Sequence, residues 1–574
     1  MKNIILLFVF PFFVAGYFTF FWRNKAVQPL VASDPASIAI CGAGSVGNFN
    51  VAANGKFIGP MPGWGKYSYP IKTSKDSAQY YFNQGLNMYY GYHMKEALAS
   101  FKEAARIDPY SPMTYWGQAL VMGPYYNAAH TYTMPEEIHG VMQKLNEIGL
   151  FNADAKEKDL IEVMNQRFFA DVIGKKRKIS NTSYAAAMRS LISKYPKDPD
   201  LKALYVDAVM LMHAWDFWNH DGTPKQWTQE LVYLSEEILK INPEHPGALH
   251  YQIHITEASR HPEVALANAD KLKNNLPGIA HMVHMASHEY QRNGLYAKGV
   301  EVNDLADANL LRYDSLAKNL SLVKHSPHYF AVQTYCAMSG AMYKTGLASA
   351  LRCRKSVAPT AENTYDQYLF MMPVLTMVRL GKWEEILQDN VAPDSKWVYA
   401  GLLHHFAKGM AYLNTGQADR AITELTALRE KAKDPILEKQ RIPFNTPLQA
   451  AWIAEEILNS AILFSQKNYD AVISSMNKAI LIEDNMIYTE PNDWPIPARQ
   501  FLGMYFLKMG KPTIAEKVYR EDISWNPGNG WSYLGLCKSL EAQKKTTQIA
   551  EYKAKYMASF SNADEIPPGS VYMR

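Results

Sequence analysis

Histidines are concentrated in residues 245–290, a stretch that holds seven of the 16 histidines in the chain. Four of them form two pairs of equal spacing, His250 with His254 and His284 with His288, and the second pair follows the first by 34 residues. Side chains four residues apart lie on one face of a helix, so both rings of a pair can reach one ion. Imidazole suits Zn, Cu, Fe and Ni, whereas Ca and Mg prefer oxygen ligands. The pattern therefore predicts a transition-metal site.

Further candidate ligands lie close to these pairs in the sequence. Glu257 follows His254 by three residues, where it could bridge two ions, hold the second nitrogen of a ligand or act as a general base. Ser326 and Pro327 are typical of an N-cap and a first helical position, which would put the flanking histidines at a helix start. So many histidines exceed one tetrahedral zinc, and three per metal would permit a dinuclear centre of Zn, Cu or Fe. The predicted ligands are His250, His254, His281, His284, His288, His325 and His328.

The remaining histidines are weaker candidates. His220 is a further candidate on a loop. His245 and His261 each precede proline and are expected to mark turns. His404 and His405 are adjacent, so their side chains point to different faces of a helix, and we interpret them as structural.

Composition and charge exclude several other functions. The chain has 574 residues, 48% of them hydrophobic and 20% charged, as in a folded protein. Its net charge is only +4 and no basic block stands out, so we expect no nucleic-acid partner. The four cysteines lie far apart without CxxC spacing, which argues against a zinc ribbon, a redox pair or a disulfide framework.

The N-terminal segment predicts membrane attachment or export. Residues 4–21 carry no charge and are followed by Arg23 and Lys25. About 20 apolar residues can span a bilayer, and no good cleavage site follows, so we favour an uncleaved anchor over a cleaved signal in residues 1–25. The flanking charges are nearly balanced and barely indicate an orientation. We expect an exported, periplasmic body that contacts the membrane through this segment.

A glycine motif in the following segment resembles a dinucleotide-binding turn. Gly42, Gly44 and Gly47 have GxGxxG spacing, but a helix must begin directly after such a turn so that its N-terminus meets the phosphates. The residues that follow are rich in Gly, Pro and Asn and have no helical period. We therefore interpret residues 26–75 as an irregular lead-in and not as a nucleotide site.

Small and aromatic residues recur at fixed offsets from residue 76 onwards. Gly85, Ala97, Phe101, Ala104 and Pro109 fall at positions 8, 20, 24, 27 and 32 of a 34-residue unit. Small residues at 8, 20 and 27 let two helices approach closely, the aromatic at 24 fills the gap, and proline at 32 ends the second helix. The same offsets recur from Gly409 and from Gly503, although Asp522 departs from the pattern at position 27.

This pattern resembles the tetratricopeptide repeat. The resemblance implies an all-α solenoid of stacked helix-turn-helix repeats over residues 76–560, in which each repeat packs on its neighbours. We expect N-terminal repeats in 76–200, histidine-rich repeats with the metal site in 201–345 and C-terminal repeats in 346–574.

The two histidine pairs take the same places in this repeat. His250 and His284 fall at position 5, and His254 and His288 at position 9, with Gly294 in the turn between helices. In the family this stripe of the first helix lines the concave groove, where ligands bind. Neighbouring first helices would therefore direct both pairs into a shared space that a ligand can reach.

Two classes of function follow from this arrangement. One metal-binding interpretation is a hydrolytic or oxidative metalloenzyme with Glu257 as its catalytic residue, and another is a metal carrier or sensor without catalysis. The alternative is a scaffold that binds a protein or peptide in its groove, the usual function of the family. The chain also resembles bacterial multi-repeat proteins with paired-histidine repeats and a C-terminal NPGNGWSYLGL unit, which supplies the fold and no reaction.

Overall fold

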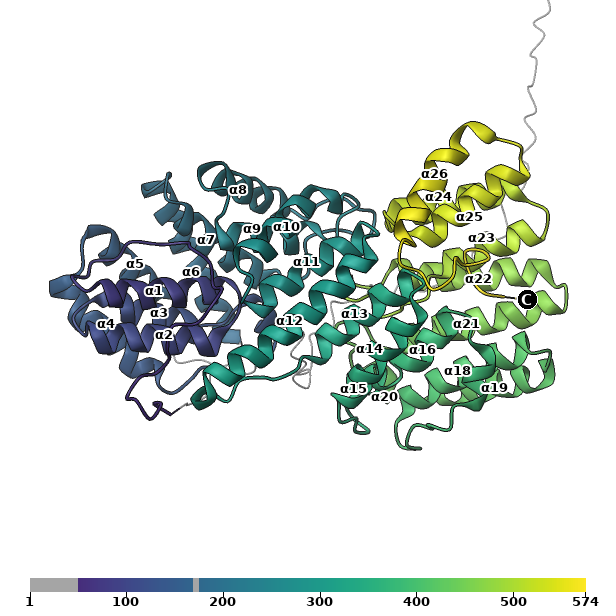
Figure 1. The fold of residues 1–574 in the computed structure, drawn as a ribbon, viewed down its shortest axis with the longest axis horizontal. Coiled ribbons are helices and arrows are strands. Elements are labelled where there is room, and N and C mark those ends of the chain that lie inside the picture. The colour runs from purple at the N-terminus through teal and green to yellow at the C-terminus, as the bar shows by residue number, and fades with distance from the viewer. Residues whose placement is uncertain (1–49, 169–174, 574) are drawn as a thin grey trace, which may run out of the picture. The chain divides into compact units, whose positions relative to one another are not determined.

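The structure is a computed structural model that describes residues 50–168 and 175–573. This part of the chain consists mainly of paired helices (Figure 1). Within these residues every regular element is a helix, and the only β-type pairing is an isolated bridge between Trp218 and Pro224. All of these helices belong to one compact unit, Ser37–Arg574. The predicted all-α class is confirmed.

The helices are short, and most follow one another after turns of a few residues. The first are α1 (Asp76–Tyr90), α2 (Met94–Ile107), α3 (Pro112–Met122), η1 (Tyr126–Ala128), α4 (Ile138–Asn152), α5 (Ala155–Arg167), α6 (Lys175–Lys194) and α7 (Pro199–Met212). The next are α8 (Thr228–Ile241), α9 (Pro246–Thr256), η2 (Pro262–Ala265), α10 (Leu266–Asn275), α11 (Ala280–Arg292), α12 (Tyr296–Leu316), η3 (Lys318–Leu320), α13 (Pro327–Ser339) and α14 (Tyr343–Lys355).

The remaining helices continue the same organisation to the end of the described chain. They are α15 (Thr364–Phe370), α16 (Met372–Arg379), α17 (Trp383–Gln388), α18 (Val398–Asn414), α19 (Ala418–Lys431), α20 (Ile436–Lys439) and α21 (Pro447–Ser465). They are followed by α22 (Tyr469–Asp484), α23 (Ala498–Lys508), α24 (Pro512–Trp525), α25 (Gly530–Ala542), η4 (Thr546–Gln548) and α26 (Ile549–Ser559). The main packing partners are sequence neighbours, such as α1 with α2, α11 with α12 and α21 with α22.

The predicted close approach of paired helices is present at the glycine and aromatic positions. A Cβ atom on Gly85 would lie 2.9 Å from the Phe101 ring, and one on Gly503 would lie 2.4 Å from the Tyr519 ring. Both aromatic side chains are fully buried. The two helices of these hairpins therefore touch where only a glycine leaves room for the aromatic ring.

The lead-in from residue 50 to residue 75 contains no helix, as predicted, and is held to the helices by hydrogen bonds. The Met61 amide donates to Gln84 Oε1 at 2.9 Å, and the Gly278 amide donates to the Gly63 carbonyl at 2.8 Å. The Tyr313 hydroxyl donates to the Pro62 carbonyl at 2.9 Å. The segment thus joins α1 to the region of α11 and α12.

The predicted anchor in residues 1–25 and the glycine motif of residues 42–47 lie outside the described residues. Among the described helices, none has the length and apolar character needed to cross a bilayer.

Buried apolar side chains gather in two large clusters along the described chain. One draws its residues from Ile58 to Tyr329 and the other from Phe330 to Val571. The histidine-rich helices α9 and α11 belong to the first cluster, and α13 supplies residues to both. The predicted repeat boundaries at residues 200 and 345 stay predictions.

Candidate metal centre

Three neighbouring helices, α9, α11 and α13, supply six of the seven predicted histidine ligands. Helix α9 contacts α11 and α11 contacts α13, so side chains at the shared faces meet. Two of these helices begin at a proline in the first helical position, Pro246 and Pro327, and this position was predicted for Pro327. Ser326 takes the N-cap position, although its hydroxyl forms no capping hydrogen bond. The six side chains are His250, His254, His281, His284, His288 and His328, and none is more than 3% exposed.

The histidines form two adjacent sets of three. In each set, one nitrogen from every ring lies within 4.8 Å of the others. We call His250, His254 and His281 the first triad, and His284, His288 and His328 the second triad. The ring centroids of His281 and His284 are 6.0 Å apart, and those of His254 and His288 are 6.1 Å apart. The two triads therefore share one buried space.

The Nε2 atoms of the rings face one another. His250 Nε2 lies 3.0 Å from His281 Nε2 in the first triad. In the second triad, His284 Nε2 lies 3.0 Å from both His288 Nε2 and His328 Nε2. His254 Nε2 is buried and has no hydrogen-bond partner. Nitrogens bound to one tetrahedral zinc at about 2.0–2.1 Å lie about 3.3 Å apart, close to the spacing seen here.

Hydrogen bonds at Nδ1 of His250 and His284 determine whether the Nε2 atoms of these rings carry a proton. His250 Nδ1 donates to the Tyr90 carbonyl at 2.6 Å, and His284 Nδ1 donates to Asn303 Oδ1 at 2.6 Å. The Asn303 amide nitrogen donates to the Gly299 carbonyl at 2.8 Å, so its oxygen must face the histidine. A neutral imidazole carries one proton, and here it is on Nδ1. The Nε2 atoms of His250 and His284 therefore present lone pairs.

Glu257 joins the two triads through their second nitrogens. Its carboxylate lies 3.0 Å from His254 Nδ1 and 2.7 Å from His288 Nδ1. It is the C-cap residue of α9 and is 1% exposed. Of the three predicted roles, this geometry corresponds to holding the second nitrogen, because its oxygens face Nδ1 atoms and not the convergent Nε2 atoms. Carboxylates in this position orient histidine ligands in metalloproteins.

Burial keeps the rings neutral. It lowers the pKa of His250 to about 3 and that of His288 to about 4. The same desolvation lowers the pKa of His254, His281 and His328 well below the ordinary value of 6.5. Neutral imidazole is the form that binds metal ions.

Burial raises the pKa of the carboxyl groups beside the triads, whereas it lowers the pKa of the histidines. Burial raises the pKa of Glu257 to about 8. Burial and the neighbouring Glu257 raise the pKa of Glu490 well above its ordinary value. A cation held by the triads would favour the ionised carboxylates and lower both pKa values.

Several residues at the centre were not predicted from the sequence. The Tyr92 ring lies 4.6 Å from the His250 ring and 5.3 Å from the His281 ring, between centroids, and its hydroxyl is buried without a hydrogen-bond partner. Its backbone φ of 56° lies in the left-handed region that few tyrosines adopt. Asn303 and Glu490 also went unpredicted. Asn303 is one of many polar helix residues, and no local signal marks any of the three.

The seventh predicted ligand, His325, is not brought into either triad. Its Nδ1 lies 2.9 Å from Asp307 Oδ1, and its side chain is 48% exposed. His325 precedes α13 and His328 lies in its first turn, and only His328 belongs to the second triad.

The histidines that the sequence marked as weaker candidates belong to neither triad. His245 is the N-cap of α9 and its Nδ1 accepts from the Ala248 amide at 3.2 Å. His261 is exposed beside Glu263, and His405 Nδ1 lies 2.7 Å from Glu424. His220 lies on a loop, at the wall of a cavity.

The sequence led us to expect that a ligand could reach the histidine stripe, and this expectation is wrong. The concave groove was expected to leave positions 5 and 9 open to a ligand, but both pairs are buried. Tyr92 and Tyr126 cover the first triad, with Tyr126 centred 4.8 Å from the His254 ring, and Tyr329 lies against His284 with centroids 4.3 Å apart. Aromatic side chains fill the space that an open groove would have left.

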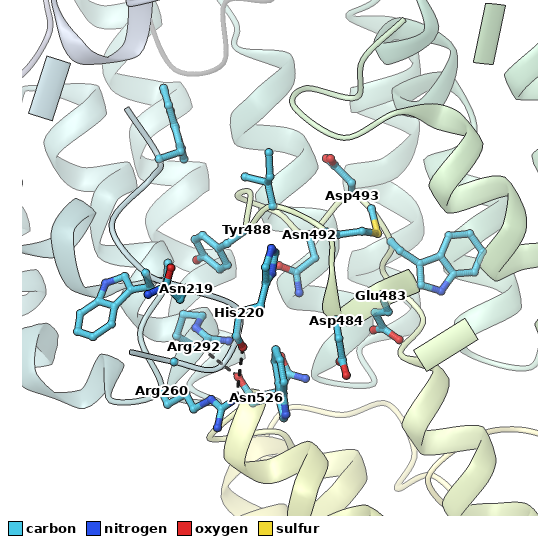
Figure 2. A pocket seen from close by; sticks show the side chains of 18 of the residues that line it. Asn219, His220, Arg260, Arg292, Glu483, Asp484, Tyr488, Asn492, Asp493 and Asn526 are labelled. Atoms are coloured by element: carbon cyan, nitrogen blue, oxygen red, sulfur yellow. Dashed lines mark hydrogen bonds between the residues drawn. The ribbon is translucent and has the colours of Figure 1, made fainter. Parts of the chain in front are cut away.

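A cavity of about 220 Å³ lies next to Glu257, since its lining includes Ala258 and Arg292, and Arg292 donates to the Glu257 carbonyl. Figure 2 shows this cavity. Its walls come from the loop at residues 215–225, from residues 258–292 and from residues 483–526. Trp215 lines it and donates from Nε1 to Glu490 Oε2 at 3.2 Å, and Glu490 in turn contacts Glu257. The cavity is thus connected to the triads through two carboxyl groups.

No family model matches the sequence, and no curated protein matches it. Solved structures similar to the chain are helical solenoids of the tetratricopeptide type. The human IFIT1 dimer with m7Gppp-AAAA matches at a TM-score of 0.31 and 12% identity, over 86% of this chain and 92% of that chain. The Cut9–Hcn1 hetero-tetramer of APC/C matches at 0.29 and 11%, over 85% and 76%. Yeast Tom70 matches at 0.28 and 12%, over 84% and 93%.

These scores are too low to transfer ligands or partners to this chain. The repeat architecture rests instead on the helix hairpins themselves, and the predicted tetratricopeptide-like solenoid is confirmed at that level. The absence of a nucleic-acid partner stays a prediction.

Proposed function

We propose that the two triads bind transition-metal ions, one in each triad, to form a dinuclear centre. One observation carries this proposal: His284 Nε2 presents a lone pair and has two further imidazole nitrogens 3.0 Å away. One lone pair can accept one strong hydrogen bond, so the second contact places nitrogen against nitrogen without a shared proton. A metal ion satisfies all three nitrogens at once.

The donor set supports zinc, copper or iron. Six neutral nitrogens without a thiolate suit these ions, and Glu257 supplies the carboxylate that orients one ring of each triad. Three histidines per ion leave a coordination position open, which metal-dependent hydrolases and oxidases use. We assign Glu257 a positioning role within this centre, in place of the predicted catalytic role.

Elemental analysis of the full chain tests the proposal. We expect about two transition-metal ions per chain, measured after expression with each metal in excess. The double variant His250→Gln/His281→Gln should lose the ion of the first triad, and His284→Gln/His328→Gln that of the second. His325→Gln is the matched control, because it removes an imidazole near α13 that belongs to neither triad.

Two results would contradict the proposed metal centre. A chain without stoichiometric metal, or double variants that keep the metal content of the His325→Gln control, would leave the triads as buried hydrogen-bonded histidines. An absorption spectrum of the loaded chain would separate copper and iron from zinc.

The alternative proposal is a scaffold that binds a protein or peptide without catalysis. It is favoured by the repeat architecture, since stacked helix pairs provide extended binding surfaces. Partner capture by the full chain in the presence and absence of a chelator separates the two proposals. Capture that is equal in both conditions, with no metal on the chain, favours the scaffold.

We propose an exported, membrane-attached location, on the basis of the uncharged stretch at residues 4–21 alone. Cell fractionation tests it. Recovery of the chain in the soluble cytoplasmic fraction would contradict this location without bearing on the metal centre.

A further inference from the structure

The cavity of Figure 2 contains two guanidinium groups without a carboxylate partner among the described residues. Arg292 donates from Nε to the Glu257 carbonyl at 2.9 Å, and from Nη2 to the carbonyls of Ser259 at 2.9 Å and Trp525 at 3.2 Å. Arg260 donates from Nη2 to the His220 carbonyl at 3.3 Å. All of these acceptors are neutral, so neither positive charge is matched by an ion pair.

Arg260 is held in the cavity by packing and not by charge. Its guanidinium lies over the Trp525 ring, 4.4 Å from the centroid. A Cβ atom on Gly222 would lie 2.7 Å from its Nε, so the loop at residues 219–223 fits closely against its stem. The Nε–H is buried and has no acceptor. Arg260 lines the cavity, and a buried donor without an acceptor in such a residue indicates that a ligand supplies one.

The opposite wall carries acids whose charges are already matched or suppressed. Arg499 binds both oxygens of Asp484, at 2.7 Å for its Nη2. Burial raises the pKa of Glu483 to about 8, so this carboxyl holds its proton near neutral pH, and burial also raises the pKa of Asp493 well above its ordinary value. Lys225 pairs with Asp216 at 3.0 Å. Within the described residues, Arg260 and Arg292 are therefore the guanidinium groups of this cavity without a direct ion pair, and Asp221 acts on Arg260 only through its charge.

Figure 2 shows Arg260 and Arg292 on one side of the cavity, across from Glu483 and Asp484. We infer that this cavity binds a small organic anion, whose carboxylate or phosphate group Arg260 and Arg292 hold by charge-assisted hydrogen bonds. Tyr488, whose hydroxyl is buried without a partner, donates to the same group. The volume of about 220 Å³ selects a small molecule over a peptide. None of the six histidines takes part in this binding, although Arg292 also donates to the Glu257 carbonyl.

Calorimetric titration of the metal-free full chain tests the inference. The probes are succinate, inorganic phosphate and the uncharged analogue succinamide, in a chloride buffer of fixed ionic strength. We expect saturable binding of succinate, phosphate or both at one site per chain, and none of succinamide. Succinate alone would assign a carboxylate ligand, and phosphate alone a phosphate ligand. Removal of the metal ensures that the anion is not binding to an ion in the triads.

Arg260→Gln should weaken the binding at least about tenfold, because it removes one charged donor and keeps part of the stem. Arg260 is half-buried at the cavity wall, so its replacement leaves the helices in place. Arg312→Gln, on the exposed face of α12, is the matched control and should change nothing. Binding of neither anion, equal binding of succinamide, or an unchanged affinity in Arg260→Gln would overturn the inference. None of these outcomes depends on the metal content of the chain.

Discussion

Asn303 illustrates what a single side chain contributes to the proposed centre. It holds the proton of His284 on Nδ1, and the Gly299 carbonyl fixes the orientation of its amide. Through this contact the Nε2 lone pair of His284 is directed at the other two rings of the second triad. A residue that touches no metal thereby decides whether a ligand is available.

Asn303→Ala should lower metal affinity about 10- to 100-fold, the usual effect of removing an outer partner of a histidine ligand. Competition with a chromogenic chelator measures it. Asn309→Ala is the control, since Asn309 is also buried on α12 but donates to the Pro277 carbonyl. Equal affinities in the two variants would mean that His284 needs no fixed tautomer.

His288 is one of the buried histidines that make stability depend on pH. The unfolded chain takes up a proton on this ring near pH 6.5, whereas the folded chain does so only near its lowered pKa of about 4. Between these values the unfolded state binds the extra proton, so His288 reduces the free energy of unfolding by about 1.4 kcal/mol per pH unit as pH falls.

His288→Gln should remove this dependence in the metal-free chain. Urea unfolding at several pH values between 6.5 and 4.5 should give a shallower loss of stability for the variant, by about one proton. His325→Gln, whose ring is half exposed, serves as the reference. If stability fell equally with pH in the unmodified chain, His288→Gln and His325→Gln, His288 would not be buried as a neutral ring.

At the scale of the helix pair, one glycine position sets how closely two helices pack. Gly503 on α23 faces Tyr519 on α24, whose hydroxyl shares a hydrogen bond of 2.7 Å with Ser570. A methyl group at this glycine would overlap the ring. The same relation between Gly85 and Phe101 joins α1 and α2, so the close approach is a property of the repeat.

Gly503→Ala should destabilise the chain by about 1–3 kcal/mol, because the buried Tyr519 ring must move. The control is Gly140→Ala on the exposed face of α4, where a Cβ meets nothing within 4 Å. There alanine should be neutral or stabilise by up to about 1 kcal/mol. Denaturant midpoints of the two variants give the comparison, and equal midpoints would contradict the packing argument.

At the scale of the whole chain, the centre ties together helices from three successive hairpins. Its rings come from α9, α11 and α13, and its outer partners extend to α1 through the Tyr90 carbonyl and to α12 through Asn303. Repeat proteins are otherwise stabilised by contacts between neighbours. A bound ion would therefore add a constraint that spans several repeats.

Metal binding should slow amide hydrogen exchange in α9, α11 and α13 and leave α24 to α26 unchanged. At an ion concentration of about 100 times Kd, the stabilisation is about 2.7 kcal/mol, or roughly 100-fold slower exchange where opening releases the ion. Mass spectrometry of the exchanged peptides resolves these helices. Protection spread evenly over the chain, or none, would argue against a centre at the triads.

Much of the architecture was predictable from local patterns. The offsets of Gly85, Phe101 and Pro109 predicted a helix pair, and the spacing of 34 residues put both histidine pairs on equivalent helices. His250, His254, His284 and His288 could be named because each pair is a local feature of one helix and recurs in register. His281 and His328 were also named, and the structure brings them to the pairs.

The rest depended on contacts between distant residues. His325 and His328 flank the same helix start, and only packing shows that one reaches the triads and the other pairs with Asp307. Glu490 reaches Glu257 from a segment that follows α22, and Tyr92 covers the first triad from the turn after α1. No periodicity relates these residues, so their roles could not be read from spacing.

The sequence by itself determined the helical repeat and placed the two histidine pairs on equivalent helices, because both depend on spacings within a few turns of helix. Tertiary structure alone decided that the rings are buried, which nitrogen of His250 is protonated and what surrounds the cavity. The Tyr90 carbonyl that orients His250 lies 160 residues away in the chain. Contacts between residues so far apart in the sequence form only when whole helices stack on one another, so local spacing does not determine them.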